Sequence, residues 1–131
     1  AAHGATCRAG DADVAALQVL HQRLQQCAAE GRITDYYAAN HAIHEAFITL
    51  ADNRWLAQAI GDLRKILRLA RLQQLHAPGR LQQSLAEHLA VFDALKRRDS
   101  EAAEAAMRTH LLHQREALRD VARNQQSRLN P

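Results

Sequence analysis

Apolar residues recur every three to four positions along most of this chain, which is the spacing of one face of an α-helix. The pattern predicts five amphipathic helices joined by short breaks. Gly31 is suited to end the first helix, and Pro78-Gly79 forms the break before the fourth. Asp99 or Ser100 can cap the last helix by accepting a backbone N–H. We expect the helices at about residues 12–29, 35–51, 54–76, 81–96 and 100–123.

The composition supports the same fold class. Apolar residues make up 47% of the 131 residues, but only 4% are aromatic, and Ala and Leu, which are strong helix formers, dominate. Because the breaks are short, consecutive helices should pack antiparallel. We therefore expect a single all-α domain, an antiparallel helical bundle over residues 1–131. Its core should span about residues 11–123, and the polar tail from Asn124 should fray.

Charge and cysteine content limit the partners and the cellular compartment that this protein could have. The net charge of +3 is too small for a strong nucleic-acid binder. No apolar run approaches the ~20 residues of a membrane span, and no signal segment opens the chain. Cys7 and Cys27 do not form a CxxC pair. These features favour a reduced, cytoplasmic protein with no membrane partner.

The placement of the histidines is the main chemical signal. His44, His88 and His110 lie within the apolar stripes of three different predicted helices, and Asn40 shares a helix face with His44. Neutral imidazole is the commonest protein ligand for transition metals, and three buried imidazoles without a metal would need other partners. The pattern leaves two possibilities open, a metal site and a set of hydrogen-bonded core histidines. The remaining histidines should lie at the surface: His3, His21, His41, His76 and His113.

Other known metal and catalytic motifs are missing from the sequence. There is no HExxH or CxxC for zinc, no ExxH for a di-iron bundle, no GxSxG, and no phosphate-binding glycine loop.

The ordered set of motifs resembles the FadR C-terminal domain, the helical effector-binding half of many GntR-superfamily regulators. Its matching segments are Asn40–His44 with Ala51-Asp52-Asn53, Pro78-Gly79-Arg80 with Glu87-His88, and Asp99, Ala102, Ala103, Met107 and His110. The resemblance covers roughly residues 11–120. It implies a divalent metal, zinc or nickel fitting best, on Asn40, His44, His88 and His110.

The chain departs from the family pattern in two respects. Asn40 stands where many members have Asp, so this ligand brings no charge. The winged helix domain that reads DNA is absent, and the first effector-domain helix is largely missing. The resemblance further implies a small organic acid effector, a homodimer, and DNA contact only through the missing domain.

Arg64, Arg68 and Arg71 flank the apolar stripe of the third predicted helix, where one could bind an effector carboxylate. Ser84, one turn before His88, could line the same pocket. For the arginines the alternative is a solvated helix face, and for Ser84 ordinary bonding within its helix.

We expect a sensor and not an enzyme. Two other readings stay open: a metal-dependent hydrolase, in which Glu87 adjoins His88 but should point to another face, and a metal-free dimerisation module.

Overall fold

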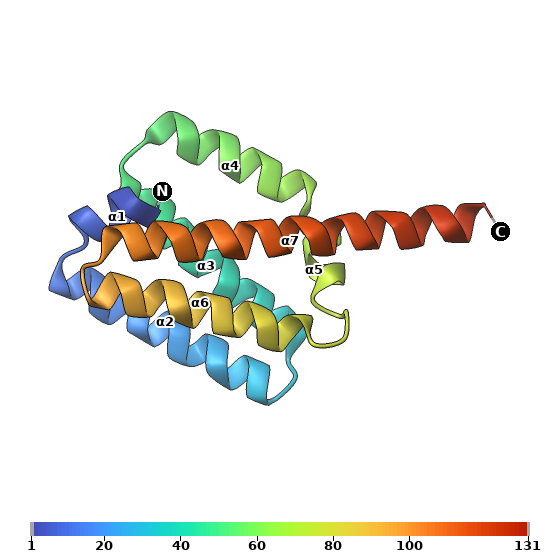
Figure 1. The fold of residues 1–131 in the computed structure, drawn as a ribbon, viewed down its shortest axis with the longest axis horizontal. Helices are drawn as coiled ribbons and strands as arrows, with labels where there is room; N and C mark the ends of the chain where they lie inside the picture. Colours follow the sequence, from blue (N-terminus) through green and yellow to red (C-terminus); the bar gives the residue numbers. More distant parts are fainter. Residues whose placement is uncertain (1, 131) are drawn as a thin grey trace.

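The computed structural model describes residues 2–130, without the side chain of Leu56. Over these residues the chain is all-α and contains no strand, which confirms the predicted fold class (Figure 1). The helices are α1 (Ala2–Arg8), α2 (Asp11–Ala29), α3 (Ile33–Ala51), α4 (Arg54–Ile66), α5 (Arg68–Gln74), α6 (Arg80–Lys96) and α7 (Ser100–Leu129).

Two antiparallel helix pairs form the body of the bundle. α2 packs against α3, α6 packs against α7, and α2 also contacts α6 (Figure 1). α1 lies across one end, against α3 and α7. Core side chains that are no more than 2% exposed include Leu17, Leu24, Tyr36, Ile43 and Leu95. The site described below therefore lies inside a packed scaffold of α3, α6 and α7.

The predicted helix boundaries are confirmed where a single residue at the helix end sets them. Gly31 follows α2 with φ +68° and Gly79 precedes α6 with φ +76°, the left-handed region that glycine adopts without strain. The Asp99 side chain accepts a hydrogen bond from the Ala102 N–H at 3.0 Å and caps α7, as predicted.

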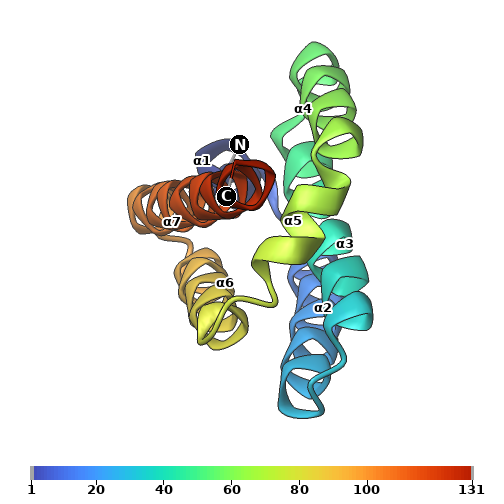
Figure 2. The same ribbon diagram turned by 90° about the vertical axis from the view of Figure 1, so that its right-hand side faces the viewer.

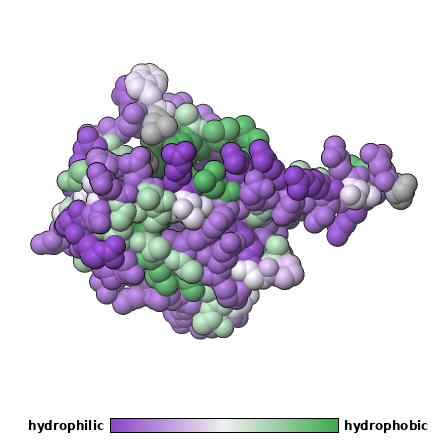
Figure 3. Space-filling view, in the orientation of Figure 1, coloured by the Kyte–Doolittle hydropathy of each residue, from purple (hydrophilic) through white to green (hydrophobic). Residues whose placement is uncertain are grey.

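The prediction of a continuous third helix is wrong. It breaks at Leu67 into α4 and α5, and α4 stands away from α7 (Figure 2). Leu63 and Leu67, which belong to the apolar stripe of this predicted helix, are 58% and 41% exposed. Their apolar face borders an opening instead of packing against α7, and Figure 3 shows hydrophobic surface in the region between α4 and α7.

Two further differences concern the ends of the chain. α1 was not predicted, because seven residues give too few apolar positions to define a helical period. The tail does not fray at Asn124: α7 continues to Leu129, beyond the bundle (Figure 1). Ion pairs one turn apart, Arg119–Glu116 at 3.0 Å and Arg123–Asp120 at 3.3 Å, support this exposed stretch.

None of the described helices is both long enough and apolar enough to cross a lipid bilayer.

Candidate metal centre

Three helices bring three histidines together at the centre of the bundle. His44 on α3, His88 on α6 and His110 on α7 are 6%, 1% and 1% exposed. One ring nitrogen of each lies within 4.8 Å of those of the other two, and the ring centroids are 4.4 to 5.3 Å apart. Two nitrogens on one zinc ion are at most ~4.2 Å apart, so small ring rotations would bring all three to one ion.

The atoms of this cluster that could bind a metal have no hydrogen-bond partner. The Nε2 atoms of His44, His88 and His110 are buried and unpartnered, and so is the Oδ1 atom of Asn40 on α3. A buried polar atom without a partner costs about 1–3 kcal/mol, so natural proteins rarely leave four in one place. A metal ion satisfies all four at once, and the arrangement therefore fits one.

The protonation states also suit metal binding. Burial, reinforced by repulsion from the neighbouring histidine, lowers the pKa values of His44 and His88 well below their usual range. Burial likewise lowers the pKa of His110, although the hydrogen bond to Glu87 opposes this effect. The imidazoles are therefore neutral near pH 7, and neutral imidazole is the form that donates a lone pair to a metal.

Glu87 on α6 orients one of the three rings. The Nδ1 atom of His110 lies 2.9 Å from its Oε1 atom. An ionised carboxylate only accepts, so His110 Nδ1 carries the hydrogen and Nε2 carries the lone pair. Arg80 donates to the same oxygen at 3.0 Å, and His113 Nδ1 donates to Oε2. Burial opposes ionisation of Glu87, but these hydrogen bonds prevail and lower its pKa to about 2.

The sequence argument missed this role for Glu87. Glu87, the residue before His88, was expected to face away from the site, whereas α7 packs close enough for Glu87 to reach His110. The seven-residue spacing from Arg80 to Glu87, two turns on one helix face, is the signal that could have indicated a buried ion pair.

His21 on α2 was predicted at the surface, and this is wrong. It is 2% exposed, stacks on Phe92 with ring centroids 4.3 Å apart, and donates from Nδ1 to the Leu17 carbonyl at 2.7 Å. The packing of α2 against α6 buries it. Its ring centroid is 6.3 Å from that of His88, and it is not part of the three-histidine cluster.

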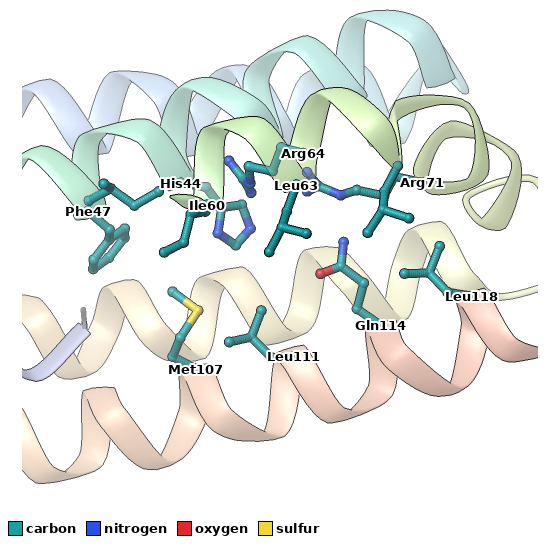
Figure 4. Close-up of a pocket in the computed structure, with 12 residues that line it drawn as sticks. His44, Phe47, Ile60, Leu63, Arg64, Arg71, Met107, Leu111, Gln114 and Leu118 are labelled. Carbon is teal, nitrogen blue, oxygen red and sulfur yellow. The ribbon is translucent and has the colours of Figure 1, made fainter. Parts of the chain in front are cut away.

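A cavity of about 300 Å³ opens beside the cluster, between α3, α4, α5 and α7 (Figure 4). His44 is the member of the three-histidine cluster that forms part of its wall. The other polar lining groups are Arg64, Arg71 and Gln114. The remaining lining residues are apolar: Phe47, Ile48, Ile60, Leu63, Leu67, Met107, Leu111 and Leu118.

Two arginines in this wall are buried without full hydrogen bonding. Arg64 is 9% exposed and Arg71 is 4% exposed. One terminal nitrogen of Arg64 and both terminal nitrogens of Arg71 have no hydrogen-bond partner, although Arg64 lies 3.9 Å from the exposed Glu45. Burial, with repulsion from Arg71, lowers the pKa of Arg64 to about 10, so it stays charged at neutral pH. Figure 4 shows Arg64 beside His44 and Arg71 farther along, with the α7 side chains opposite.

The other two residues proposed for effector binding lie elsewhere. Arg68 is exposed and lines a second groove, which it shares with Arg64 and His41. Ser84 is buried and accepts a hydrogen bond from the Tyr36 hydroxyl at 2.8 Å. Neither residue is part of the wall of the cavity beside His44.

Comparison with protein-family models matches residues 1–113 to the FCD domain. The chain therefore belongs to the FCD family, the effector-binding C-terminal domain of FadR-type regulators in the GntR superfamily. The match begins at residue 1 and so includes α1. A comparison with curated proteins finds no match.

Proposed function

We propose that this chain is the ligand-sensing domain of a bacterial FadR-type transcription regulator, and that it binds a small carboxylate effector at a metal centre. One observation carries the proposal: arginine side chains with unpartnered nitrogens line a cavity whose wall also includes His44, a member of the cluster of buried histidines with unpartnered Nε2 atoms. Membership of the FCD family supports the regulatory role.

The metal would be held by His44, His88 and His110, with Asn40 as a fourth ligand. Three imidazoles and one amide oxygen suit a divalent transition metal, and zinc or nickel fits this set best. When bound, the ion supplies a local positive charge and open coordination positions that attract an anion. Glu87 fixes the orientation of His110.

Arg64 and Arg71, which line the same cavity as His44, would bind the effector. A planar guanidinium forms paired hydrogen bonds with a carboxylate, and the apolar wall lowers the local dielectric, which strengthens that interaction. Arg68 and Ser84 are not among the residues of this wall, which supports effector contact through Arg64 and Arg71.

The effector would act by differential affinity. The regulator works as a cytoplasmic homodimer whose separate winged helix domains contact DNA, and the effector favours one of two arrangements of those domains. A hundredfold preference for one arrangement contributes ~2.7 kcal/mol to the switch. This role requires no chemical step.

Two observations favour a sensor over the alternatives. Among the described residues, the lining of the cavity includes no acidic side chain to act as a general base, and Glu87 is engaged by His110, His113 and Arg80. A metal-free dimerisation module would leave these four buried metal-ligating atoms without any partner, at a cost of about 1–3 kcal/mol each.

A thermal-shift screen of carboxylates, run with and without metal, tests the proposal. Ligands that bind only the folded state raise the midpoint of unfolding by mass action. Carboxylates should stabilise the zinc-loaded domain and lose this effect after chelation. Equal stabilisation by carboxylates without metal, or stabilisation only by neutral sugars or amines, would contradict the metal-anchored site.

A further inference from the structure

A second hollow lies where α3, α4 and α5 contact one another (Figure 2). Its volume is about 390 Å³, and none of the three clustered histidines lines it. Among the described residues its lining includes no Asp or Glu and several basic side chains, so we call it the basic groove. The lining residues are Thr34, Tyr37, Ala38, His41, Arg64, Lys65, Arg68 and Leu72.

The basic groove lies in a strongly basic part of the chain. Residues 54–79, which form α4, α5 and the loop before α6, contain five Lys or Arg residues and one acidic residue, Asp62. The net charge of this segment, +4, exceeds the +3 of the whole chain, so the other residues together carry −1. Positive charge is therefore gathered on these two helices and is not spread evenly over the sequence.

Two cations of the groove have no acidic partner in the protein. Lys65 and Arg68 are exposed, and neither forms an ion pair with a described residue. Asp62 lies one turn before Lys65 but is not paired with it. Lys65 and Arg68 do not line the cavity beside His44. An effector carboxylate in that cavity would therefore leave their charges unbalanced.

Arg64 contributes a third, buried cation. It is 9% exposed, and one of its terminal nitrogens has no hydrogen-bond partner. Arg64 Nη1 and His41 Nε2 each lie 3.9 Å from the same Oε1 atom of Glu45, so the two nitrogens are at most 7.8 Å apart. The Glu45 side chain is 48% exposed and too distant to accept a hydrogen bond from either. The basic groove therefore combines close positive groups with little compensating charge.

These groups suit a phosphate better than a carboxylate. Arg64, Lys65 and Arg68 bring three positive charges, while His41 and Thr34 add an imidazole and a hydroxyl. A phosphate monoester carries a charge of about −1.5 to −2 at pH 7 and three acceptor oxygens, whereas a carboxylate carries one charge and two oxygens. Guanidinium groups also match the geometry of phosphate oxygens. The volume of the groove lies in the range of small-ligand pockets.

We propose that the basic groove binds the phosphate group of a small molecule, with Arg64, Lys65 and Arg68 as its cationic contacts. Inorganic phosphate and a phosphate ester present the same oxygens, so the test includes both. This site is additional to the effector site of the proposed function and requires no metal. Lys65 and Arg68 distinguish the two sites experimentally, because Arg64 lines both hollows.

Isothermal titration of the purified domain, before and after chelation of its metal, tests the site. The probes are inorganic phosphate and methyl phosphate, with acetate as the matched carboxylate. Methyl phosphate should bind the chelated domain about two- to fivefold more tightly than acetate, the contribution of one additional exposed charge pair. Chelation should not weaken phosphate binding. Added salt should weaken it, because solvent ions screen exposed charges.

A double variant, Lys65→Met with Arg68→Met, removes two of the three cations and leaves Arg64 in place. Phosphate binding should weaken about tenfold, since each exposed charge pair contributes up to about fivefold. The zinc content and any stabilisation by carboxylates should not change, because neither residue lines the cavity beside His44. Arg68→Lys keeps the charge and should lose less affinity than Arg68→Met.

The matched control combines Arg23→Met and Arg108→Met. Both arginines are exposed and lie outside the basic groove, so this variant removes the same net charge from other surfaces. It should retain the phosphate affinity of the parent. An equal loss in the two double variants would reflect the overall charge of the domain and overturn the groove assignment.

The remaining outcomes are equally decisive. Absence of phosphate binding overturns the proposal. Binding that disappears on chelation, in a domain that stays folded by circular dichroism, places the phosphate at the metal and also overturns it. If chelation unfolds the domain, the two double variants of the metal-loaded protein decide. Duplex DNA that binds more tightly than either phosphate, and only when Lys65 and Arg68 are present, makes nucleic acid the ligand instead. A parent domain without zinc contradicts the proposed function and leaves the groove unaffected.

Discussion

Replacing Glu87 with alanine would remove the acceptor that orients His110 while leaving all four proposed metal ligands in place. The His110 Nδ1–H would lose its carboxylate partner at 2.9 Å, and either ring nitrogen could then carry the hydrogen. Removing an outer partner of this kind lowers metal affinity about 10- to 100-fold, or about 1.4 to 2.7 kcal/mol. Glu87→Gln keeps an acceptor oxygen and should lose less.

The same change affects folding stability. Arg80 is 5% exposed and pairs with Glu87 at 3.0 Å, so Glu87→Ala leaves a buried cation with less compensation. Breaking a buried pair costs about 3–5 kcal/mol. We expect the lower end of that range, because Arg80 still donates to Gln74 at 2.8 Å and to Gln83 at 3.2 Å.

Zinc affinity should be measured by competition with a chromophoric chelator, and the His110 tautomer by ¹⁵N NMR of the metal-free domain. Metal-free protein should carry the hydrogen on Nδ1 of His110, and Glu87→Ala should give a mixture. Glu104→Gln, an exposed change on α7, is the matched control. Unchanged zinc affinity and an unchanged tautomer in a folded Glu87→Ala domain would refute the positioning role.

Four further expectations follow from the site. Unchelated domain should contain about one zinc or nickel ion per chain by elemental analysis, and metal-free protein never exposed to chelator or low pH would contradict the centre. His88→Ala and His110→Ala should each abolish metal binding but keep most of the helical circular dichroism; metal binding as tight as in the parent would show the ligands to be wrong. Asn40→Asp should tighten zinc binding by adding a charged oxygen ligand, and weaker or equal binding in the chelator competition would argue against Asn40. The metal-free domain should lose stability as the pH falls below 6.5, because burial lowers the pKa values of His44, His88 and His110, so the unfolded chain binds more protons in this range; urea unfolding that is independent of pH from 7.5 to 5.5 would contradict this.

The helices and the histidine cluster could be read from the sequence because both depend on local periodicity. A 3.6-residue period fixes which side chains share a face, so His44, His88 and His110 could each be assigned to the apolar face of a helix. The ends of those helices were equally local, since Gly31, Gly79 and Asp99 act through their own backbone. The family motifs then favoured a common metal site over three separate core histidines.

The surroundings of the cluster depended on how the helices pack, which no local period encodes. Arg64, Arg68 and Arg71 would share one face of a continuous helix, but the helix breaks at Leu67, and packing buries Arg64 and Arg71 in the cavity wall while Arg68 is exposed. His21 is buried because α2 packs on α6.

Glu87 shows most clearly that the contacts of the cluster depend on helix packing. Its sequence neighbour is a proposed metal ligand on α6, yet its hydrogen bond is to a ligand on α7, 23 positions away. Such a contact depends on the separation and rotation of two packed helices, which are set by the fit of all their side chains together. The sequence alone therefore determined most of the helices and the inward faces of His44, His88 and His110, while the tertiary structure decided which charged side chains meet them.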